Sequence, residues 1–74
     1  MKKNKATTDF GIHFTKISSR ITGLLRTSGP LTLQEIQNIT KESYYAISTS
    51  VGMMYQDNVI DIHSDGNGVM VYLA

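Results

Sequence analysis

The stretch from Pro30 to Ile60 constrains the fold most, because two helix signals stand in it only a few residues apart. The first signal is the tetrapeptide 32–35, Thr-Leu-Gln-Glu, which has the form of a capping box. In this motif the threonine hydroxyl accepts a hydrogen bond from the glutamate amide, and the glutamate side chain accepts one from the threonine amide. It predicts a short helix from about Leu33 to Ile39, with Leu33, Ile36 and Ile39 on one side.

A longer helix is expected to follow, with Ser43 or Thr40 as its N-cap and its end near Asp57. Its spacing turns five residues inward: Ala46, Ile47, Ser50, Val51 and Met54. Its outer side then carries Tyr45, Ser48, Thr49, Gly52, Met53 and Gln56. Because glycine in mid-helix costs roughly 1 kcal/mol relative to alanine, we expect another backbone to approach closely at Gly52. Two helices joined by so short a break form a helix-turn-helix.

Further elements are predicted on both sides of this motif. A first helix is expected from Asp9, as its N-cap, to about Arg26, with an apolar stripe of Phe10, Phe14, Ile17, Ile21, Leu24 and Leu25. Leu31 fits a short extended segment. Alternating residues in 59–64 and 69–73, around the loop Asp65–Gly68, predict a β-hairpin. Three helices followed by a C-terminal hairpin make an α+β fold, the winged helix-turn-helix.

A chain of 74 residues allows one domain, with a marginal core. We expect residues 1–8 to form a flexible basic arm and residues 9–74 a single winged helix domain. The chain has no cysteine, which excludes disulfides and thiolate metal sites, so that stability must come from packing or oligomerisation. Neither a secretory signal nor a membrane span is predicted, and a cytoplasmic location is expected.

Positive charge is concentrated at the start of the chain. All seven Lys and Arg residues fall within 1–41, where only two acidic residues oppose them, a balance of +5. From residue 42 onward there are four acidic residues and no Lys or Arg, a balance of −4. This asymmetry predicts two faces with different partners.

No catalytic constellation is predicted. His13 and His63 are far apart and lack the orienting partner that a general base needs. Asp61, His63 and Asp65 alternate, but nothing completes a metal-ligand set. The glycines 66 and 68 belong to a hairpin rather than a phosphate-binding turn. We therefore expect a non-enzymatic protein without a metal or cofactor.

The pattern resembles a family of small, uncharacterised bacterial winged helix-turn-helix domains of the Bacteroidetes type. Members carry a Gly-Trp-Leu-Ala-Arg-Glu-like segment late in their third helix, to which residues 51–60 correspond here. The spacing also matches without a gap through Leu31, Leu33, Ile36, Thr40, Ile47, Gly52 and Ile60. Met53 replaces the family's Trp and Gln56 its Arg, and the family's Gly and Trp late in helix one fall near Ser19 and Thr22. The resemblance implies the fold, self-association and, by analogy only, DNA binding.

Double-stranded DNA is the usual partner of this fold, whose third helix enters the major groove. Hydroxyl and amide side chains can bond base edges, and Lys, Arg and Tyr can reach phosphates. The residues predicted for a DNA-binding, transcription-related regulator are Lys41, Tyr44, Tyr45, Ser48, Thr49, Lys2, Lys3, Lys5, Lys16 and Arg20. Lys41 is the single cation at the start of helix three, and Glu42 stands beside it.

A protein-interaction module is the alternative prediction. Met53 and Tyr55 are soft or aromatic side chains of the kind that interfaces favour, and Gly52 would let a second helix approach. The residues predicted for such an interface, in a homodimer or with another protein, are Gly52, Met53, Tyr55 and Met70.

Overall fold

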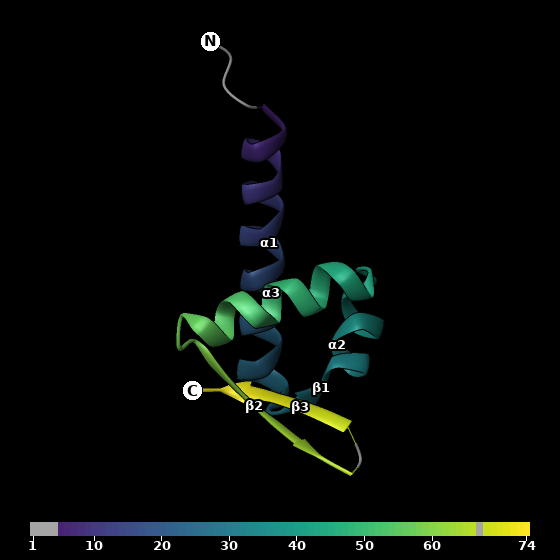
Figure 1. The fold of residues 1–74 in the computed structure, drawn as a ribbon. Helices are drawn as coiled ribbons and strands as arrows, with labels where there is room; N and C mark the ends of the chain where they lie inside the picture. The colour runs from purple at the N-terminus through teal and green to yellow at the C-terminus, as the bar shows by residue number, and fades with distance from the viewer. Residues whose placement is uncertain (1–4, 67) are drawn as a thin grey trace.

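The computed structural model describes residues 5–66 and 68–74, with the side chains of residues 13–64, 66 and 68–74. Its elements are α1 (Lys5–Ser28), β1 (Leu31–Thr32), α2 (Leu33–Thr40), α3 (Tyr44–Gln56), β2 (Ile60–Asp65) and β3 (Gly68–Leu73). Figure 1 shows α3 lying across α1, with α2 beside α1 and the sheet at the C-terminal end of α1. The described residues thus form an α+β fold of three helices and one three-stranded antiparallel sheet.

The first helix begins earlier than the sequence predicted, at Lys5 rather than Asp9. Residues 5–8 of the predicted flexible arm therefore belong to α1, and Asp9 lies inside the helix instead of capping it. The physical reason is that Lys5-Ala6-Thr7-Thr8 contains no Gly or Pro to stop the helix. The rest of the predicted arm, residues 1–4 with Lys2 and Lys3, lies outside the described residues.

The sheet joins the predicted hairpin to a short third strand. β2 and β3 pair antiparallel, from Ile60 opposite Leu73 to Asp65 opposite Gly68, which confirms the predicted hairpin. β1 pairs with the other side of β3, with Leu31 opposite Val71, so the strand order is β1-β3-β2. The extended segment predicted at Leu31 is therefore a strand, which places the start of α2 against the sheet.

Short polar contacts fix the ends of α2 and α3. Glu35 donates its amide to the Thr32 hydroxyl at 3.0 Å, and the Glu35 carboxylate accepts from the Thr32 amide at 2.8 Å, so the predicted capping box is confirmed. Lys41 ends α2 in the left-handed region, with φ 63°. Of the two predicted caps of α3, Ser43 is the one observed, because its hydroxyl accepts from the Ala46 amide at 3.1 Å.

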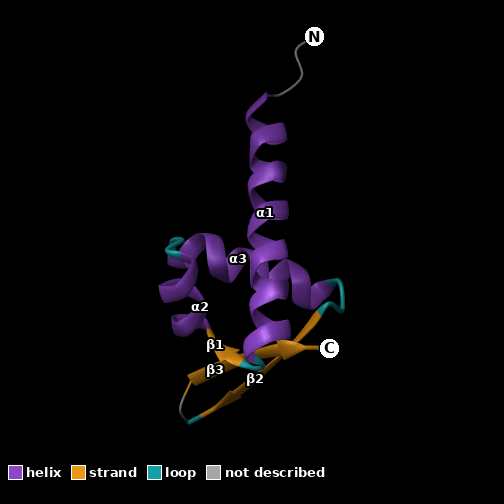
Figure 2. Ribbon diagram, turned by 180° about the vertical axis from the view of Figure 1, so that it is seen from behind, coloured by secondary structure: helices purple, strands orange, loops and turns teal. Residues whose placement is uncertain are grey.

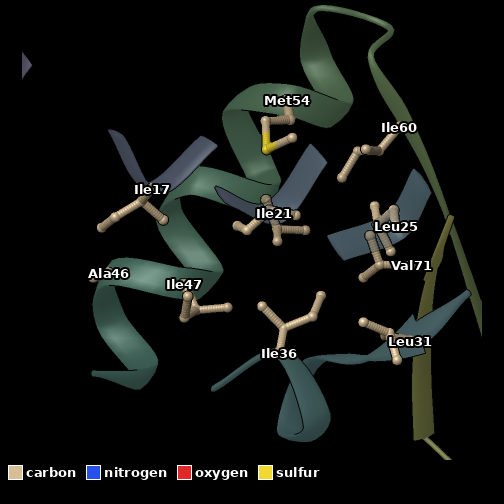
Figure 3. Packing of buried hydrophobic residues seen from close by; sticks show 11 residues of the cluster. Ile17, Ile21, Leu25, Leu31, Ile36, Ala46, Ile47, Met54, Ile60 and Val71 are labelled. Carbon is tan, nitrogen blue, oxygen red and sulfur yellow. The ribbon is translucent and has the colours of Figure 1, made fainter. Parts of the chain in front are cut away.

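One aliphatic cluster holds all the elements together. Figure 3 shows side chains of α1, α2, α3 and the sheet converging on it. Its least exposed members, at 0–1% of their surface, are Ile17 and Ile21 of α1, Ile36 of α2, Ile47 of α3, Ile60 of β2 and Val71 of β3. The stripe predicted for α1 is confirmed from Phe14 to Leu25, with Leu24 partly buried. The side chain of Phe10 lies outside the described part.

The prediction that Leu33, Ile36 and Ile39 share one side of α2 is wrong for Ile39. Ile36 is completely buried and Leu33 partly buried, but 49% of the Ile39 surface is exposed. A step of three residues turns a helical side chain by less than one full turn, so successive steps drift around the helix. Ile39 therefore points away from the core, and the last residue of α2, Thr40, is buried instead.

The N-terminal half of α1 extends beyond the other elements. A helix of 24 residues is about 36 Å long. Figures 1 and 2 show, from opposite sides, that its first turns project past α3, away from the sheet. In the described part of the chain, no helix has the length and apolar character needed to cross a membrane.

Ser50 is expected to weaken the fold. Its side chain is completely buried in α3, and its hydroxyl has no hydrogen-bond partner among the described residues. A buried unsatisfied hydroxyl costs about 1–3 kcal/mol. We therefore predict that Ser50→Ala raises the free energy of unfolding by about 1 kcal/mol, measured by urea denaturation followed by circular dichroism.

Ser43→Ala is the matched control, because the same substitution seven residues earlier removes the N-cap of α3. It should lower the free energy of unfolding by about 1 kcal/mol. A loss of stability in Ser50→Ala would contradict the assignment of an unsatisfied hydroxyl.

Candidate functional site

The orientation of α3 is fixed by its buried side. The five residues predicted to face inward, Ala46, Ile47, Ser50, Val51 and Met54, are all buried. The opposite side of the helix, predicted to face outward, is exposed at Tyr45, Gly52, Met53 and Gln56 and half-buried at Ser48 and Thr49. We call the outward residues Tyr44, Tyr45, Ser48, Thr49, Gly52, Met53, Tyr55 and Gln56 the α3 face.

The α3 face is uncharged and carries several large hydrophobic side chains. Between Tyr44 and Gln56 the sequence contains no acidic or basic residue. In the part of the chain that the structure describes, the exposed large hydrophobic side chains all lie on α3 or close to its ends: Ile39 49%, Tyr44 60%, Tyr45 69%, Met53 50%, Tyr55 52% and Val59 42%. Such a concentration makes this surface the candidate interaction site of the chain.

Small residues form the middle of the α3 face. The Ser48 hydroxyl donates to the Tyr45 carbonyl at 3.3 Å, which keeps the serine side chain close to the helix. A Cβ atom added to Gly52 would meet nothing within 4 Å. The close backbone approach predicted at Gly52 is therefore absent within the described chain, because this side of α3 faces away from the core.

The structure brings together one part of the predicted DNA site. Lys41 is exposed in the turn before α3, next to Tyr44 and Tyr45 at the N-terminal end of the helix. Ser48 and Thr49 follow one turn later. Lys16 is exposed, but helical periodicity places it on the side of α1 opposite to the buried stripe, away from the α3 face. Lys5 begins α1 at its far end, where its side chain is outside the described part.

Arg20 has a structural role that the sequence reading missed. Its guanidinium donates to the Thr40 carbonyl at 3.2 Å and lies 3.5 Å from a carboxylate oxygen of Glu42. His13 lies 3.9 Å from the other oxygen of Glu42. These contacts tie the turn between α2 and α3 to α1, so part of the half-exposed Arg20 guanidinium is engaged within the chain. Arg20 and Glu42 are 22 positions apart, so no local sequence pattern could have revealed their contact.

The predicted interface residues divide between two surfaces. Gly52, Met53 and Tyr55 belong to the α3 face. Met70 lies on β3, where it alternates with the buried Val71 and pairs with Thr32 and His63. Because successive strand residues point to opposite sides, Met70 lies on the side of the sheet away from the core and from α3. The structure therefore does not group Met70 with the other three.

A groove of about 640 Å³ borders the α3 face, between α1 and the end of α3. Ser18, Thr22 and Arg26 line its α1 wall, and Met53 and Asp57 line the opposite wall. Its walls thus combine small hydroxyl groups, one cation and one anion with the apolar side chains of Phe14, Met53 and Val59. Among the described residues, no group of three or more His, Cys, Asp or Glu side chains is placed to hold a metal ion.

Comparisons with known proteins identified no relative of this chain. No family model matches the chain, and neither a curated protein nor a solved structure matches it significantly.

The contacts of Arg20 predict a small effect on stability. Arg20→Ala should lower the free energy of unfolding by about 0.5–1 kcal/mol, because a half-exposed ion pair contributes little and one hydrogen bond is lost with it. Urea denaturation measures the change, and a double-mutant cycle with Glu42→Gln isolates the coupling.

Lys16→Ala is the matched control, since Lys16 is exposed one turn earlier on the same helix. It should leave the free energy of unfolding nearly unchanged. Equal effects of Arg20→Ala and Lys16→Ala, with no coupling to Glu42, would contradict a role for Arg20 in holding the turn.

Proposed function

We propose that the protein is a small, non-enzymatic winged helix module that contacts another protein through the α3 face. One observation carries the proposal: a helix of 13 residues without a charged side chain presents three exposed tyrosines and an exposed methionine. The cores of protein interfaces are enriched in aromatic residues and methionine and depleted of charge. Methionine also adapts its shape to a partner.

The order of the elements supports the winged helix part of the proposal. β1 lies between α1 and α2 in sequence and pairs with β3, while the β2–β3 hairpin follows α3 directly. In this arrangement α2 and α3 form the helix-turn-helix and the hairpin forms the wing. The same order, with the spacing from Leu31 to Ile60, supports the proposed distant relation to the small bacterial winged helix family.

Cysteine footprinting tests the protein-contact proposal. The chain has no cysteine, so one introduced thiol reports on one position. Gln56→Cys lies on the α3 face, and Gly23→Cys is its control at an exposed position of α1. In a nuclease-treated extract of cells that express each variant, the thiol at position 56 should react with maleimide several-fold more slowly than in dilute purified protein.

The thiol at position 23 should react at the same rate in both samples. If the thiol at position 56 is protected only in extract that has not been treated with nuclease, the partner is a nucleic acid and the protein-contact proposal is wrong. Equal rates at position 56 in all samples would also overturn it.

DNA binding is the second candidate, favoured by the grouping of Lys41, Tyr44, Tyr45 and Ser48 at the N-terminal end of α3. Such residues can contact phosphates and base edges. Charge weighs against this candidate, because Lys and Arg contacts to phosphate supply most non-specific affinity. Lys41 is the one basic residue of this group, and Arg20 is held by Thr40 and Glu42.

A salt series with mixed-sequence duplex DNA separates the two candidates. We expect no saturable binding by fluorescence anisotropy, even at low salt. If the DNA candidate is right, the logarithm of affinity falls linearly with the logarithm of salt concentration, and Lys41→Gln reduces that slope by about 1. Arg20→Gln, the control, should then leave the slope unchanged.

A further inference from the structure

We infer that the groove between α1 and the end of α3 binds a short peptide that has apolar side chains and free amino and carboxyl termini. The groove is separate from the α3 face, with which it shares Met53 alone, so this site goes beyond the proposed function. Three properties of the groove favour such a ligand: its shape and apolar floor, the opposite charges of its two walls, and its hydroxyl groups.

The groove is long and has an apolar floor. Figure 1 shows α3 lying across α1, and the groove lies where the side of α1 meets the C-terminal end of α3. Its α1 wall extends from Phe14 to Arg26, which is about 18 Å of helix. Phe14 and Met54 line the groove although both are buried, so they form its floor. Sites of roughly 300–1,000 Å³ hold ligands larger than a single amino acid, and a groove of about 640 Å³ falls in this range.

Asp57 stands at the unfavourable end of a helix. It is the C-cap of α3, where the helix macrodipole already places partial negative charge. The ion pairs of the described part are those of Glu42 with Arg20 and His13, so the exposed Asp57 carboxylate has no described cation within 4 Å. A carboxylate in this position favours a positively charged ligand group, and the amino terminus of a peptide supplies one.

Arg26 provides the opposite charge on the other wall of the groove. Its side chain is exposed on α1 and, like that of Asp57, lies outside the ion pairs of the described part. A guanidinium binds a carboxylate through two parallel hydrogen bonds, so Arg26 fits the carboxyl terminus of a peptide. A ligand with both charges satisfies both walls, whereas a simple anion or cation would meet one group of its own sign.

Hydroxyl groups line the α1 wall between the floor and the charges. Thr22 donates its hydroxyl to the Ser18 carbonyl at 2.9 Å, whereas the hydroxyls of Ser18 and Ser19 have no hydrogen bond to another described residue. A hydroxyl can both donate and accept. These two can therefore pair with the N–H and C=O groups that a peptide carries between its termini and that a fatty acid or a single amino acid lacks.

Nuclear magnetic resonance of the isotope-labelled full chain tests this site, with trileucine as the probe. Trileucine with free termini should shift the amide resonances of residues 14–26 and 53–59 in a saturable way. N-acetylated trileucine, trileucine amide and free leucine should each bind roughly fivefold more weakly or worse, because each lacks a charge or the peptide body.

Two substitutions test the roles of the charges. Asp57→Asn should weaken the binding of free trileucine roughly fivefold and leave the binding of N-acetylated trileucine unchanged. Arg26→Gln should weaken free trileucine by a similar factor and leave trileucine amide unchanged. Asp61→Asn on β2 and Lys16→Gln on α1 are the matched controls, because both residues are exposed and neither lines the groove. Both controls should bind trileucine like the wild type.

The inference is wrong if trileucine causes no saturable shifts, if free and N-acetylated trileucine bind equally well, or if Asp61→Asn weakens binding as much as Asp57→Asn. Shifts confined to residues 44–49 would place the peptide on the α3 face and would also contradict the groove. Failure of the groove leaves the proposed function untouched, because that function is tested by the protection of a thiol at position 56, outside the groove.

Discussion

The fold depends on one small aliphatic cluster to which every helix and both long strands contribute at least one fully buried residue. Ile17 and Ile21 of α1 meet Ile36, Ile47, Ile60 and Val71 from the other elements. A chain of this size has no second core to compensate for a loss. The cluster therefore sets the rotation of α3 as well as its position, because Ile47 and Val51 must point inward. The exposure of Tyr45 and Gly52 on the opposite side follows from that requirement.

Local chemistry made much of the fold predictable from the sequence. The capping box at 32–35 and the spacing of the five inward residues of α3 each involve neighbours within a few positions, so their patterns are visible in one dimension. The start of α1 at Lys5 is not evident from the sequence, because Asp9 has the form of a strong cap whereas residues 5–8 merely lack helix breakers. The exposure of Ile39 was not predicted, because in a helix of two turns the same spacing is compatible with more than one buried side.

The candidate site was less predictable because its character depends on contacts between distant residues. Arg20 reads as a free cation in the sequence, and only the fold places it against Thr40 and Glu42. Gly52 was predicted to mark the close approach of another backbone, yet no atom lies within 4 Å of a Cβ added at this position. The outward direction of α3 was predicted correctly, but the sequence alone did not show that the exposed large hydrophobic side chains of the described part gather around this helix.

The edge of the sheet has a consequence for how copies of this chain can meet. β2 is an outer strand in the order β1-β3-β2, and a bare strand edge offers backbone groups to which another strand can add. Asp61 and His63 alternate along this edge and are exposed, so a strand added here would bring its own side chains against these polar groups. Polar edges of this kind discourage strand addition and the fibrous growth that can follow it. At this edge the fold is thereby protected against open-ended extension of the sheet.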